Sequence, residues 1–347
     1  MKSITTYPLT EIKNLLQDLG QPSFRAQQLV DWIYVKGATS YDAMTNLPQT
    51  LRTLLSEHHP LHAPRIIDKQ TSHDGTRKYV LEFDDGVKVE TVGIPSFDTT
   101  PEGDPKHLTV CFSTQAGCPM QCAFCATGTE GLTRNLSSGE MILQIITVQN
   151  DFQTRVSHVV AMGQGEPFLN YNATLEALRF MNAKKGLEIG ARHITVSTCG
   201  VIPGIDRFAQ EPEQFTLAVS LHSAQQAIRD ELMPQCAHWP LSDLKEALCS
   251  YVDKTNRRVS LEYLMIKNLN DTPHALQSLC DFADGLLSHI NLIPFNSVDH
   301  CSYQPSTEAT IIQFQKALTR VGIETTIRNS RGSDIAGACG QLKNKLR

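Results

Sequence analysis

An alternation of two patterns that begins near residue 107 constrains the fold of this chain more than any other feature. Short apolar runs with the composition of buried strands are each followed by a segment with helical periodicity. A capping box formed by Ser137 and Glu140 marks the start of the first of these helices. Such alternation is typical of a parallel sheet, so we expect an α/β fold whose six units curl into a partial (β/α) barrel. The strand-like runs lie at 107–113, 157–163, 193–198, 215–222, 258–266 and 289–296.

The residues before this alternation predict a group of short helices. Thr10 is expected to cap a first helix that ends at Gly20, and Ser23 to cap a second helix that ends at Gly37. A further apolar segment with helical spacing follows at 47–55.

β-Structure is expected after these helices, at 77–95. Apolar and polar residues alternate there around the pair Asp85-Gly86, which is a common hairpin turn. We therefore expect two domains. Residues 1–100 would form a small N-terminal accessory domain, helical at first and then β, and residues 101–347 would form the barrel.

Composition and charge indicate the cellular compartment and the partners to expect. The N-terminus has no apolar signal core and no run of 18 apolar residues occurs, so we expect no membrane segment. Ten unevenly spaced cysteines in 347 residues indicate a reducing cytoplasm, where clustered cysteines bind metal or do chemistry. The net charge of −5 does not indicate a nucleic-acid partner, although residues 316–347 carry seven Lys or Arg against two acidic residues.

Three cysteines in the stretch GCPMQCAFCATG indicate a metal cofactor. Cys118, Cys122 and Cys125 form a C-x3-C-x2-C array. A structural zinc site usually takes four ligands in two separated pairs, whereas a 4Fe–4S cluster held by three thiolates keeps one iron open. The open iron can take the amino and carboxylate groups of S-adenosylmethionine (SAM), and Phe124 before the third cysteine fits such a site. The residues favour this cluster, with zinc and three unrelated core thiols as the alternatives.

Six stretches of the sequence, in order, resemble the RlmN/Cfr family of radical-SAM RNA adenine methyltransferases. They are GQPSFRAQQLVDWIYVKGATSYDAMTNLPQTLR, VETVGIP, CFSTQAGCPMQCAFCATGTEGLTRNL, MGQGEP, SLHS and ACGQL. The resemblance runs over nearly the whole chain. It implies a partial (β/α)6 radical-SAM barrel with an N-terminal accessory domain. It also implies one 4Fe–4S cluster per chain, held by Cys118, Cys122 and Cys125, with SAM on the open iron.

The resemblance further implies three catalytic residues and two SAM molecules per turnover. A ring carbon of adenine is not nucleophilic, so a radical route is needed. Cys339 matches the cysteine that takes a methyl group from SAM and delivers it to the ring. Cys111 matches the cysteine that releases the product by forming a transient disulfide bond with Cys339. Glu90 matches the general base that removes the proton from the ring carbon.

Seven further positions match the SAM contacts of the family. All lie at or just after the carboxyl ends of expected strands, the edge where barrel enzymes build their sites. Each polar residue among them, taken singly, is more typical of a turn or a cap. The seven are Gly165, Glu166, Ser197, Ser220, Leu221, His222 and Asn296.

The substrate implied by the resemblance is an adenosine in the peptidyl-transferase centre of 23S ribosomal RNA, methylated at C2, with transfer RNA as a candidate second substrate. The stretch RNSRGSDI before Cys339 favours C2, and Cfr-type methylation of C8 in the same RNA is the alternative. We expect the N-terminal helices and the basic tail to bind RNA through phosphates and shape. The resemblance implies a monomeric cytoplasmic enzyme that takes electrons from a donor such as flavodoxin or ferredoxin.

Two hypotheses from other classes stay open on the residues. A cluster- or zinc-containing RNA-binding module would leave Cys339, Cys111 and Glu90 without a role. A radical activase of a protein substrate would use the clustered cysteines but not Cys339. The remaining cysteines are interpreted as packing or surface residues, and they are Cys199, Cys236, Cys249, Cys280 and Cys301.

Overall fold

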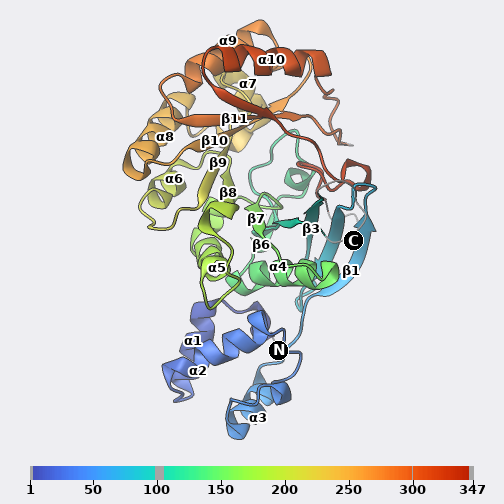
Figure 1. Ribbon diagram of the computed structural model, residues 1–347, viewed down its shortest axis with the longest axis vertical. Coiled ribbons are helices and arrows are strands. Elements are labelled where there is room, and N and C mark those ends of the chain that lie inside the picture. Colours follow the sequence, from blue (N-terminus) through green and yellow to red (C-terminus); the bar gives the residue numbers. More distant parts are fainter. Residues whose placement is uncertain (1–2, 98–104, 299, 344–347) are drawn as a thin grey trace.

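A computed structural model describes residues 3–97, 105–298 and 300–343 (Figure 1). The short N-terminal helices form a unit at one end of the molecule, and the remainder is a large curved sheet with helices on its outer face. No helix in these ranges is both long and apolar enough to cross a membrane.

The N-terminal unit consists of short helices, as the sequence predicts. Gly20 and Gly37 end the first two at positive φ angles of +67° and +64°, a conformation that costs glycine no Cβ clash. The unit packs on the barrel through Tyr34, whose ring meets Phe180 edge-to-face at 5.6 Å between centroids. Its elements are η1 (Ile4–Thr6), α1 (Leu9–Asp18), α2 (Ser23–Val30), the π-helical turn η2 (Asp31–Val35), η3 (Tyr41–Ala43) and α3 (Gln49–His58).

The expected N-terminal caps of these two helices are wrong. α1 begins at Leu9, one residue before Thr10, and Ser23 is the first residue of α2 and not its cap. The reason for α1 lies in the tertiary structure. The Glu176 carboxylate, on a barrel helix, accepts hydrogen bonds from the N–H groups of Leu9 (3.0 Å) and Thr10 (2.9 Å). A carboxylate from another element therefore satisfies the free helix donors, and the local sequence gives no sign of it.

Ten strands form one sheet, in the order β1-β2-β3-β4-β7-β8-β9-β10-β11-β12. Neighbouring strands pair in parallel from β4 to β12, so the predicted α/β fold with a partial barrel is confirmed. All six expected strands are present, whereas the short, polar β12 was not predicted. The strands are β1 (Arg65–Thr71), β2 (Arg77–Glu82), β3 (Lys88–Ser96), β4 (His107–Cys111), β7 (His158–Ala161), β8 (Ile194–Thr198), β9 (Thr216–Ser220), β10 (Val259–Met265), β11 (Ser288–Pro294) and β12 (Glu324–Ile327). A separate hairpin pairs β5 (Gln115–Gly117) with β6 (Leu132–Asn135).

Helices connect the parallel strands and cover the outer face of the sheet. The predicted capping box of Ser137 and Glu140 is present at the start of α4. The α-helices of this part are α4 (Ser138–Phe152), α5 (Tyr171–Asn182), α6 (Ile202–Phe208), α7 (Gln226–Leu232), α8 (Leu241–Thr255), α9 (Pro273–Ala283) and α10 (Glu308–Arg320). Short helical turns complete the list: η4 (Ala126–Glu130), η5 (Pro167–Asn170), η6 (Ala191–His193), η7 (Pro234–Cys236) and η8 (Ser333–Ile335).

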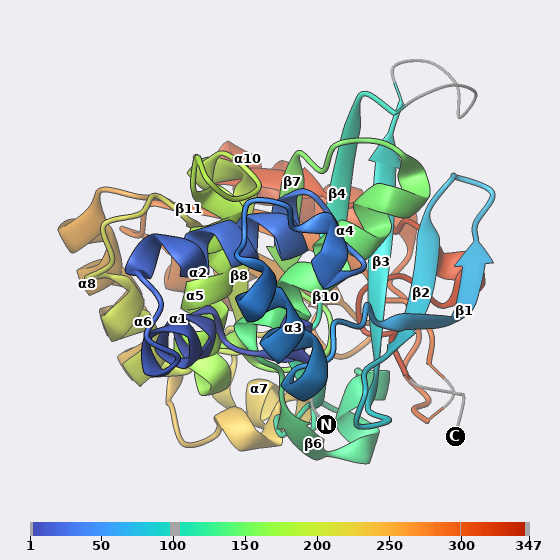
Figure 2. The same ribbon diagram turned by 90° about the horizontal axis from the view of Figure 1, so that it is seen from below.

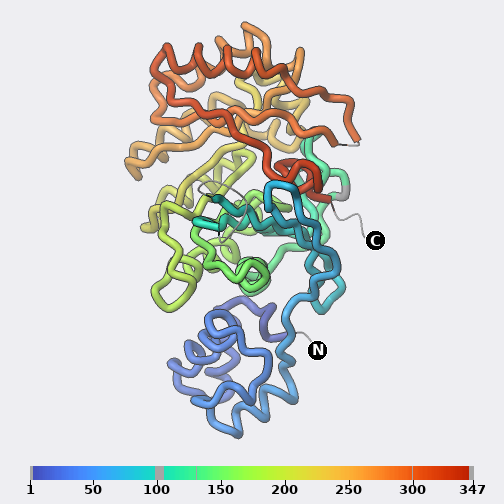
Figure 3. The backbone as a smooth tube through the Cα atoms, turned by 45° about the vertical axis from the view of Figure 1, so that its right-hand side comes forward, coloured from blue at the N-terminus to red at the C-terminus, as the bar shows by residue number. Residues whose placement is uncertain are grey.

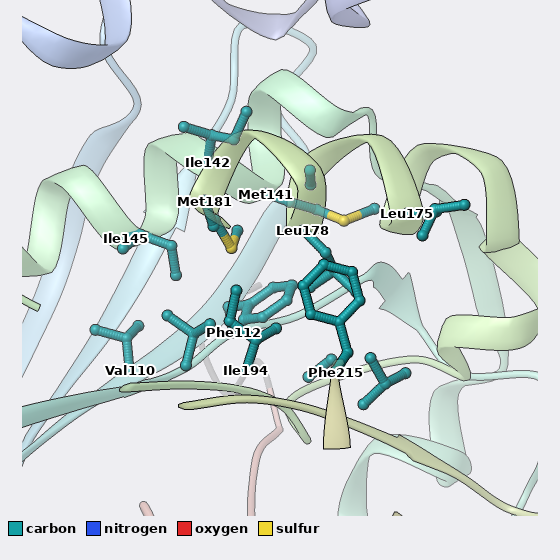
Figure 4. Close-up of a cluster of buried hydrophobic side chains, with 14 of the residues drawn as sticks. Val110, Phe112, Met141, Ile142, Ile145, Leu175, Leu178, Met181, Ile194 and Phe215 are labelled. Atoms are coloured by element: carbon teal, nitrogen blue, oxygen red, sulfur yellow. The ribbon is translucent and has the colours of Figure 1, made fainter. Parts of the chain in front are cut away.

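The main core lies between the sheet and these helices (Figure 4). Val110 of β4 and Phe112, directly after β4, are fully buried there against α4 residues such as Met141. Complete burial of a side chain of this size contributes about 1.5–3 kcal/mol. Because strand residues alternate between faces, Cys111 points the other way, to the inner face of the partial barrel.

Strands β1 to β3 extend the sheet antiparallel at one edge (Figure 2). The predicted turn is present between β2 and β3, where Gly86 has a φ of +79°. On the next pair of strands Val92 lies opposite Cys111, so Glu90, two residues away, shares the inner face with Cys111. The domain boundary expected near residue 100 lies outside the described residues.

Candidate active site

The three clustered cysteines lie on one loop, between β5 and η4. Gly117 has a φ of +75°, and a Cβ there would lie 2.0 Å from the Gly131 carbonyl oxygen, so only glycine fits where the loop closes. The Cys118 N–H donates to the same carbonyl (2.9 Å), and the Cys125 N–H donates to the Cys122 carbonyl (3.1 Å). These local bonds gather the three thiols that the sequence singled out.

The thiols of the loop are surrounded by protein and by one another. Burial, with a smaller contribution from the nearby Glu166 carboxylate, raises the pKa of Cys118 to about 12. Burial also raises the pKa of Cys125. A hydrogen bond with Cys199 lowers the pKa of Cys122, but burial and the neighbouring thiols outweigh it. Free thiols would therefore be protonated at neutral pH, and a positively charged metal centre is what would hold them as thiolates.

The donor set of the loop fits an iron–sulfur cluster. A cluster binds each thiolate through a different iron, whereas a single metal ion needs all of its ligands around one point. Within the described ranges, no group of three or more Cys, His, Asp or Glu side chains is arranged so that it could hold a metal ion. Three thiols are also one ligand short of the usual zinc set. The floor of the loop is apolar, because Met120 and Cys122 pack with Leu232 and Met233. Such a floor would exclude water from a cluster.

Gly165 and Glu166 follow β7 and lie beside the loop. Gly165 has a φ of +104°, its added Cβ would lie 2.6 Å from a neighbouring side chain, and its N–H approaches the Cys118 thiol. Glu166 is 1% exposed, and its two oxygens accept the N–H groups of Phe168 (3.0 Å) and Cys199 (2.7 Å). Burial raises the pKa of this carboxyl, while the N–H groups oppose the rise. Glu166 thus joins the loops after β7 and β8, and its contact with SAM stays a prediction.

Leu221 and His222 follow β9. The Leu221 side chain is fully buried in the main core, so only its backbone could reach a ligand. The His222 ring packs edge-to-face on Phe124 (4.7 Å between centroids), and its Nδ1 accepts the Leu264 N–H (3.1 Å). Burial lowers the pKa of His222 to about 3, so the ring is neutral at physiological pH. His222 thus packs against the cysteine loop through Phe124.

Ser197 of β8 and Ser220 of β9 alternate with core residues and so lie on the inner face. Beside them the structure places Glu262 of β10, which the sequence analysis missed. The Asn291 amide donates to the Glu262 carboxylate (2.7 Å), and burial raises the pKa of this carboxyl. The Glu262 charge also raises the pKa of Cys339, so these two groups are near each other. A glutamate within the apolar run RVSLEYLMI was the only sequence sign of this position.

The C-terminal segment, residues 331–343, folds back beside the cysteine loop and the edge strands (Figure 3). The Gly340 carbonyl accepts the Ala126 N–H (2.8 Å), directly after the third cysteine. The buried Thr127 hydroxyl donates to the Leu342 carbonyl (2.7 Å). Two bonds thus attach the segment to the helical turn that follows the loop.

Cys339 and Cys111 are brought together by this docking. Cys111 is buried at the end of β4 and packs with Val92 and Leu342. Burial raises the pKa of Cys111, and the Cys339 thiol raises it further. Cys339 is exposed, although protein atoms crowd its sulfur and raise its pKa, and its carbonyl accepts the Asn296 amide (3.4 Å). Both cysteines are free thiols.

Glu90 is 1% exposed on the inner face of β3. Its carbonyl accepts the Ser113 hydroxyl (2.6 Å) and its N–H donates to the Gln164 side chain (3.3 Å), which fixes the strand at this point. Lys78 of β2 lies beside it, with Nζ 3.3 Å from Glu90 Oε1. Lys78 was not predicted as a site residue, because a lysine in an alternating strand usually lies on the solvent face.

Cys199 and Cys236 are closer to the site than the sequence analysis expected. The Cys236 thiol donates to the Cys199 carbonyl (3.3 Å), and both residues pack beside Cys122. These two cysteines therefore pack against the cysteine loop. Cys249, Cys280 and Cys301 are half-buried.

Comparison with known proteins matches both parts of the chain. Residues 4–60 match the ribosomal RNA large subunit methyltransferase N-terminal domain, and residues 112–278 match the radical SAM superfamily. Two curated relatives carry the name probable dual-specificity RNA methyltransferase RlmN. The one from Clostridium novyi is 40% identical, with 99% of this chain and 98% of the relative aligned. The one from Bacillus subtilis is 43% identical, with 99% and 94% aligned.

A solved structure shares the whole architecture. The crystal structure of a radical SAM methyltransferase from Sphaerobacter thermophilus is 39% identical and superimposes with a TM-score of 0.89, over 99% of both chains. The N-terminal helical unit and the partial barrel are therefore both present in that enzyme.

Proposed function

The chain belongs to the RlmN family of radical-SAM RNA methyltransferases, and on this premise we propose that it methylates C2 of an adenosine in the peptidyl-transferase centre of 23S ribosomal RNA. Transfer RNA is proposed as the second substrate, because the relatives are named dual-specificity enzymes. One observation carries the proposal: Cys111 and Cys339, far apart in the sequence, lie together beside the loop of clustered cysteines.

Cys118, Cys122 and Cys125 are proposed to hold one 4Fe–4S cluster whose open iron takes SAM. When bound, cluster and SAM would supply a carbon radical through reductive cleavage, with flavodoxin or ferredoxin as the electron donor. The protein would orient SAM through groups at the carboxyl edge of the sheet. These are Gly165, Glu166, Ser197, Ser220, the Leu221 backbone, His222 and Asn296.

Cys339 is proposed to be the methyl carrier. Its sulfur would form a bond to the methyl carbon of a first SAM, while the SAM sulfur leaves with the electron pair of the broken bond. Because its pKa is raised, the thiol must lose its proton as it attacks. The exposure of Cys339 supports this role, since an adenine that has left its stack could reach the sulfur.

Glu90 and Cys111 would complete the reaction once three changes have occurred. The methyl group on Cys339 would have lost a hydrogen atom to the carbon radical, the methylene carbon would have added to the ring, and the unpaired electron of the adduct would have passed to an acceptor such as the cluster. Glu90 takes the proton from the ring carbon, which its place on the same face as Cys111 supports. The Cys111 sulfur then forms a disulfide bond with Cys339, and the bond between Cys339 and the methylene carbon breaks. The electron pair of that bond passes to the carbon, which gains a proton, and an external reductant restores the two thiols.

The N-terminal helical unit is proposed to bind RNA. Its surface carries Phe24, 54% exposed, under the Arg25 guanidinium, and Trp32 under the Lys36 ammonium (3.8 Å to the ring centroid). An exposed ring, Phe24, and a half-buried ring, Trp32, each beside a cation, suit stacking on unpaired bases and contact with phosphates. The last residues of the basic tail, 344–347, lie outside the described residues.

The decisive experiment identifies the methylated atom. Reduced enzyme is incubated with SAM and, in separate reactions, with protein-free 23S ribosomal RNA and with transfer RNA. The RNA is then digested and the methyladenosine isomer is identified by mass spectrometry. We expect 2-methyladenosine in both RNAs. Dominant 8-methyladenosine would assign the Cfr-type reaction, and unmodified RNA in both reactions would refute the proposed function.

A further inference from the structure

A buried lysine lies between the proposed base and the segment that carries Cys339. The side chain of Lys78, on β2, is 6% exposed and that of Glu90, on β3, is 2% exposed, with 3.3 Å between Nζ and Oε1. The register of β2 and β3 fixes the backbone positions of both residues, because Lys78 pairs with Val92 and Val80 pairs with Glu90. Lys78 and Glu90 are therefore diagonal neighbours on the inner face.

The same ammonium group also reaches the C-terminal segment. Lys78 Nζ donates to the Ala336 carbonyl (3.4 Å), three residues before Cys339. Ala336 has a φ of +50°, a backbone conformation that a non-glycine residue adopts only where its surroundings hold it. One side chain thus contacts both the carboxylate and the turn that leads to the methyl carrier.

Stability alone does not explain a buried pair of charges. Removal of both charges from water costs free energy, and a well-packed apolar pair at such a position is often as stable or more stable. Tyr79 and Leu81, on the opposite face of the same strand, are fully buried apolar or aromatic residues. The charged pair lies on the face that carries Glu90, Cys111 and the C-terminal segment, which indicates a role in the chemistry.

We propose that Lys78 is a positioning residue that keeps Glu90 ionised and aligns the carboxylate with the Cys339 segment. The inference rests on the proposed function, in which Glu90 removes the ring proton. A cation next to a buried carboxylate favours its charged form, and only the charged form can accept a proton. The hydrogen bond to Ala336 would keep Glu90 and Cys339 at a constant separation during the reaction.

Besides Lys78, ionisable groups of β2, β3, β4 and the C-terminal segment lie on the same face as Glu90. Along the same face of β2 and β3 the next cross-strand pair is Glu82 and Lys88, and Glu82 is also paired with Arg65. β4 contributes Cys111, whose pKa is raised, and the C-terminal segment contributes Cys339. Because both thiols titrate above neutral pH, the acidic limb of a pH–rate profile would report on the carboxylate.

The test compares Lys78→Met with a matched control, Lys69→Met. Lys69 lies on the adjacent strand β1 and pairs with Asp151 (2.9 Å), but its side chain is 43% exposed. Lys69 lies opposite Tyr79 and therefore on the other face of the sheet from Lys78. Three quantities are measured in each variant: methylation of Cys339 by intact-protein mass spectrometry, the amount of protein–RNA adduct on a denaturing gel, and the rate of methyladenosine formation from pH 5.5 to 9.

We expect Lys78→Met to methylate Cys339 normally and to accumulate the protein–RNA adduct at pH 7. Loss of the cation should raise the pKa of Glu90, so the acidic limb moves to higher pH and methyladenosine forms about tenfold more slowly at pH 7. Activity should recover as the pH rises. Lys69→Met should keep the wild-type profile. A purely structural role of Lys78 would lower the rate equally at every pH.

Lys78→Arg keeps the charge and covers the case in which Lys78→Met does not fold. We expect its acidic limb to stay within about half a unit of the wild type, although its rate falls because the guanidinium is larger. An unshifted limb in a folded Lys78→Met, or a limb shifted upwards in Lys78→Arg, would overturn the inference. If the wild type forms no methyladenosine, the proposed function itself has failed, and that outcome is separate from these.

Discussion

The cysteine loop and the C-terminal segment supply the two halves of the proposed site, and they are held in opposite ways. The loop places its three thiols within eight residues and closes on itself between Gly117 and Gly131. The C-terminal segment is held by distant partners. Thr127, 215 positions away, donates to Leu342, and the Ser72 hydroxyl, 262 positions away, donates to the Asp334 carboxylate (2.6 Å). The proposed cofactor site is thus encoded locally, whereas the position of the proposed methyl carrier depends on the completed fold.

This difference predicts that the two halves can be disabled separately. Changes in the loop should remove the cofactor and every later step. Changes at the C-terminal segment should leave the cofactor in place and stop the reaction at a defined stage.

The largest effect is expected from the loop itself. Cys118→Ala should bind less than half of the wild-type iron and should not cleave SAM, because two thiolates cannot replace three. Iron and sulfide analysis of anaerobically purified protein, with chromatographic detection of 5′-deoxyadenosine, measures both quantities. Cys249→Ala, a half-buried cysteine on α8, is the control and should behave as the wild type. Wild-type SAM cleavage by Cys118→Ala would contradict the cluster assignment.

The next effect separates the two proposed catalytic cysteines, Cys111 and Cys339. Cys339→Ala should form no methyladenosine but should keep its iron and cleave SAM slowly, because the loop is intact. Cys111→Ala should complete the addition and then stall, since no thiol can displace Cys339 from the methylene carbon. A denaturing gel should show a protein–RNA species that requires SAM and reductant.

The double variant Cys111→Ala/Cys339→Ala is the control for that gel. It should show no protein–RNA species, because the RNA is attached through Cys339. Full turnover by Cys111→Ala, or a covalent species in the double variant, would mean that the two roles are assigned wrongly.

A smaller effect is expected where the two halves meet. Thr127→Val removes the hydroxyl that donates to Leu342, a buried bond worth about 1 kcal/mol. The equilibrium between docked and undocked C-terminal segment should shift about fivefold towards the undocked form, so methylation should slow by up to that factor at unchanged iron content. Thr129→Val, on the same helical turn, loses only a local bond to Ala126 and is the matched control. An equal loss in both variants would show that docking is not what Thr127 contributes.

The smallest effect concerns stability and not activity at neutral pH. In the unfolded chain the His222 ring takes up a proton below its ordinary pKa of 6.5, whereas in the folded protein it does so only near 3. Between these values the unfolded state binds more protons, so stability falls as the pH falls below 6.5, by at most about 1.4 kcal/mol per pH unit.

Urea unfolding at pH 7.5 and 5.5 measures this loss. His222→Gln should lose less stability between the two pH values than the wild type does. His238→Gln, at an exposed position, should match the wild type. If wild type and His222→Gln lose the same stability, the neutral ring of His222 is not the cause.

Predictions from the sequence succeeded where the interactions are local. The capping box of Ser137 and Glu140, the turn at Gly86 and the six alternating strands all follow from patterns within a few residues, and all are present. The caps of α1 and α2 were wrong. For α1, the donors are satisfied by Glu176, far along the chain. β12 was missed because its four residues, ETTI, carry no apolar run, and its place in the sheet comes from pairing with β11.

The sequence by itself determined the family, the α/β fold and the loop of three cysteines, because periodicity and short spacings are properties of neighbouring residues. Only the tertiary structure decided which distant groups meet. Cys339 approaches Cys111 because bonds to Thr127 and Asn296 dock the C-terminal segment, and Lys78 meets Glu90 because the β2–β3 register makes them diagonal neighbours. The physical reason is that the burial and the charge state of a side chain depend on the groups that surround it in space. Strand pairing brings together groups that are far apart along the chain.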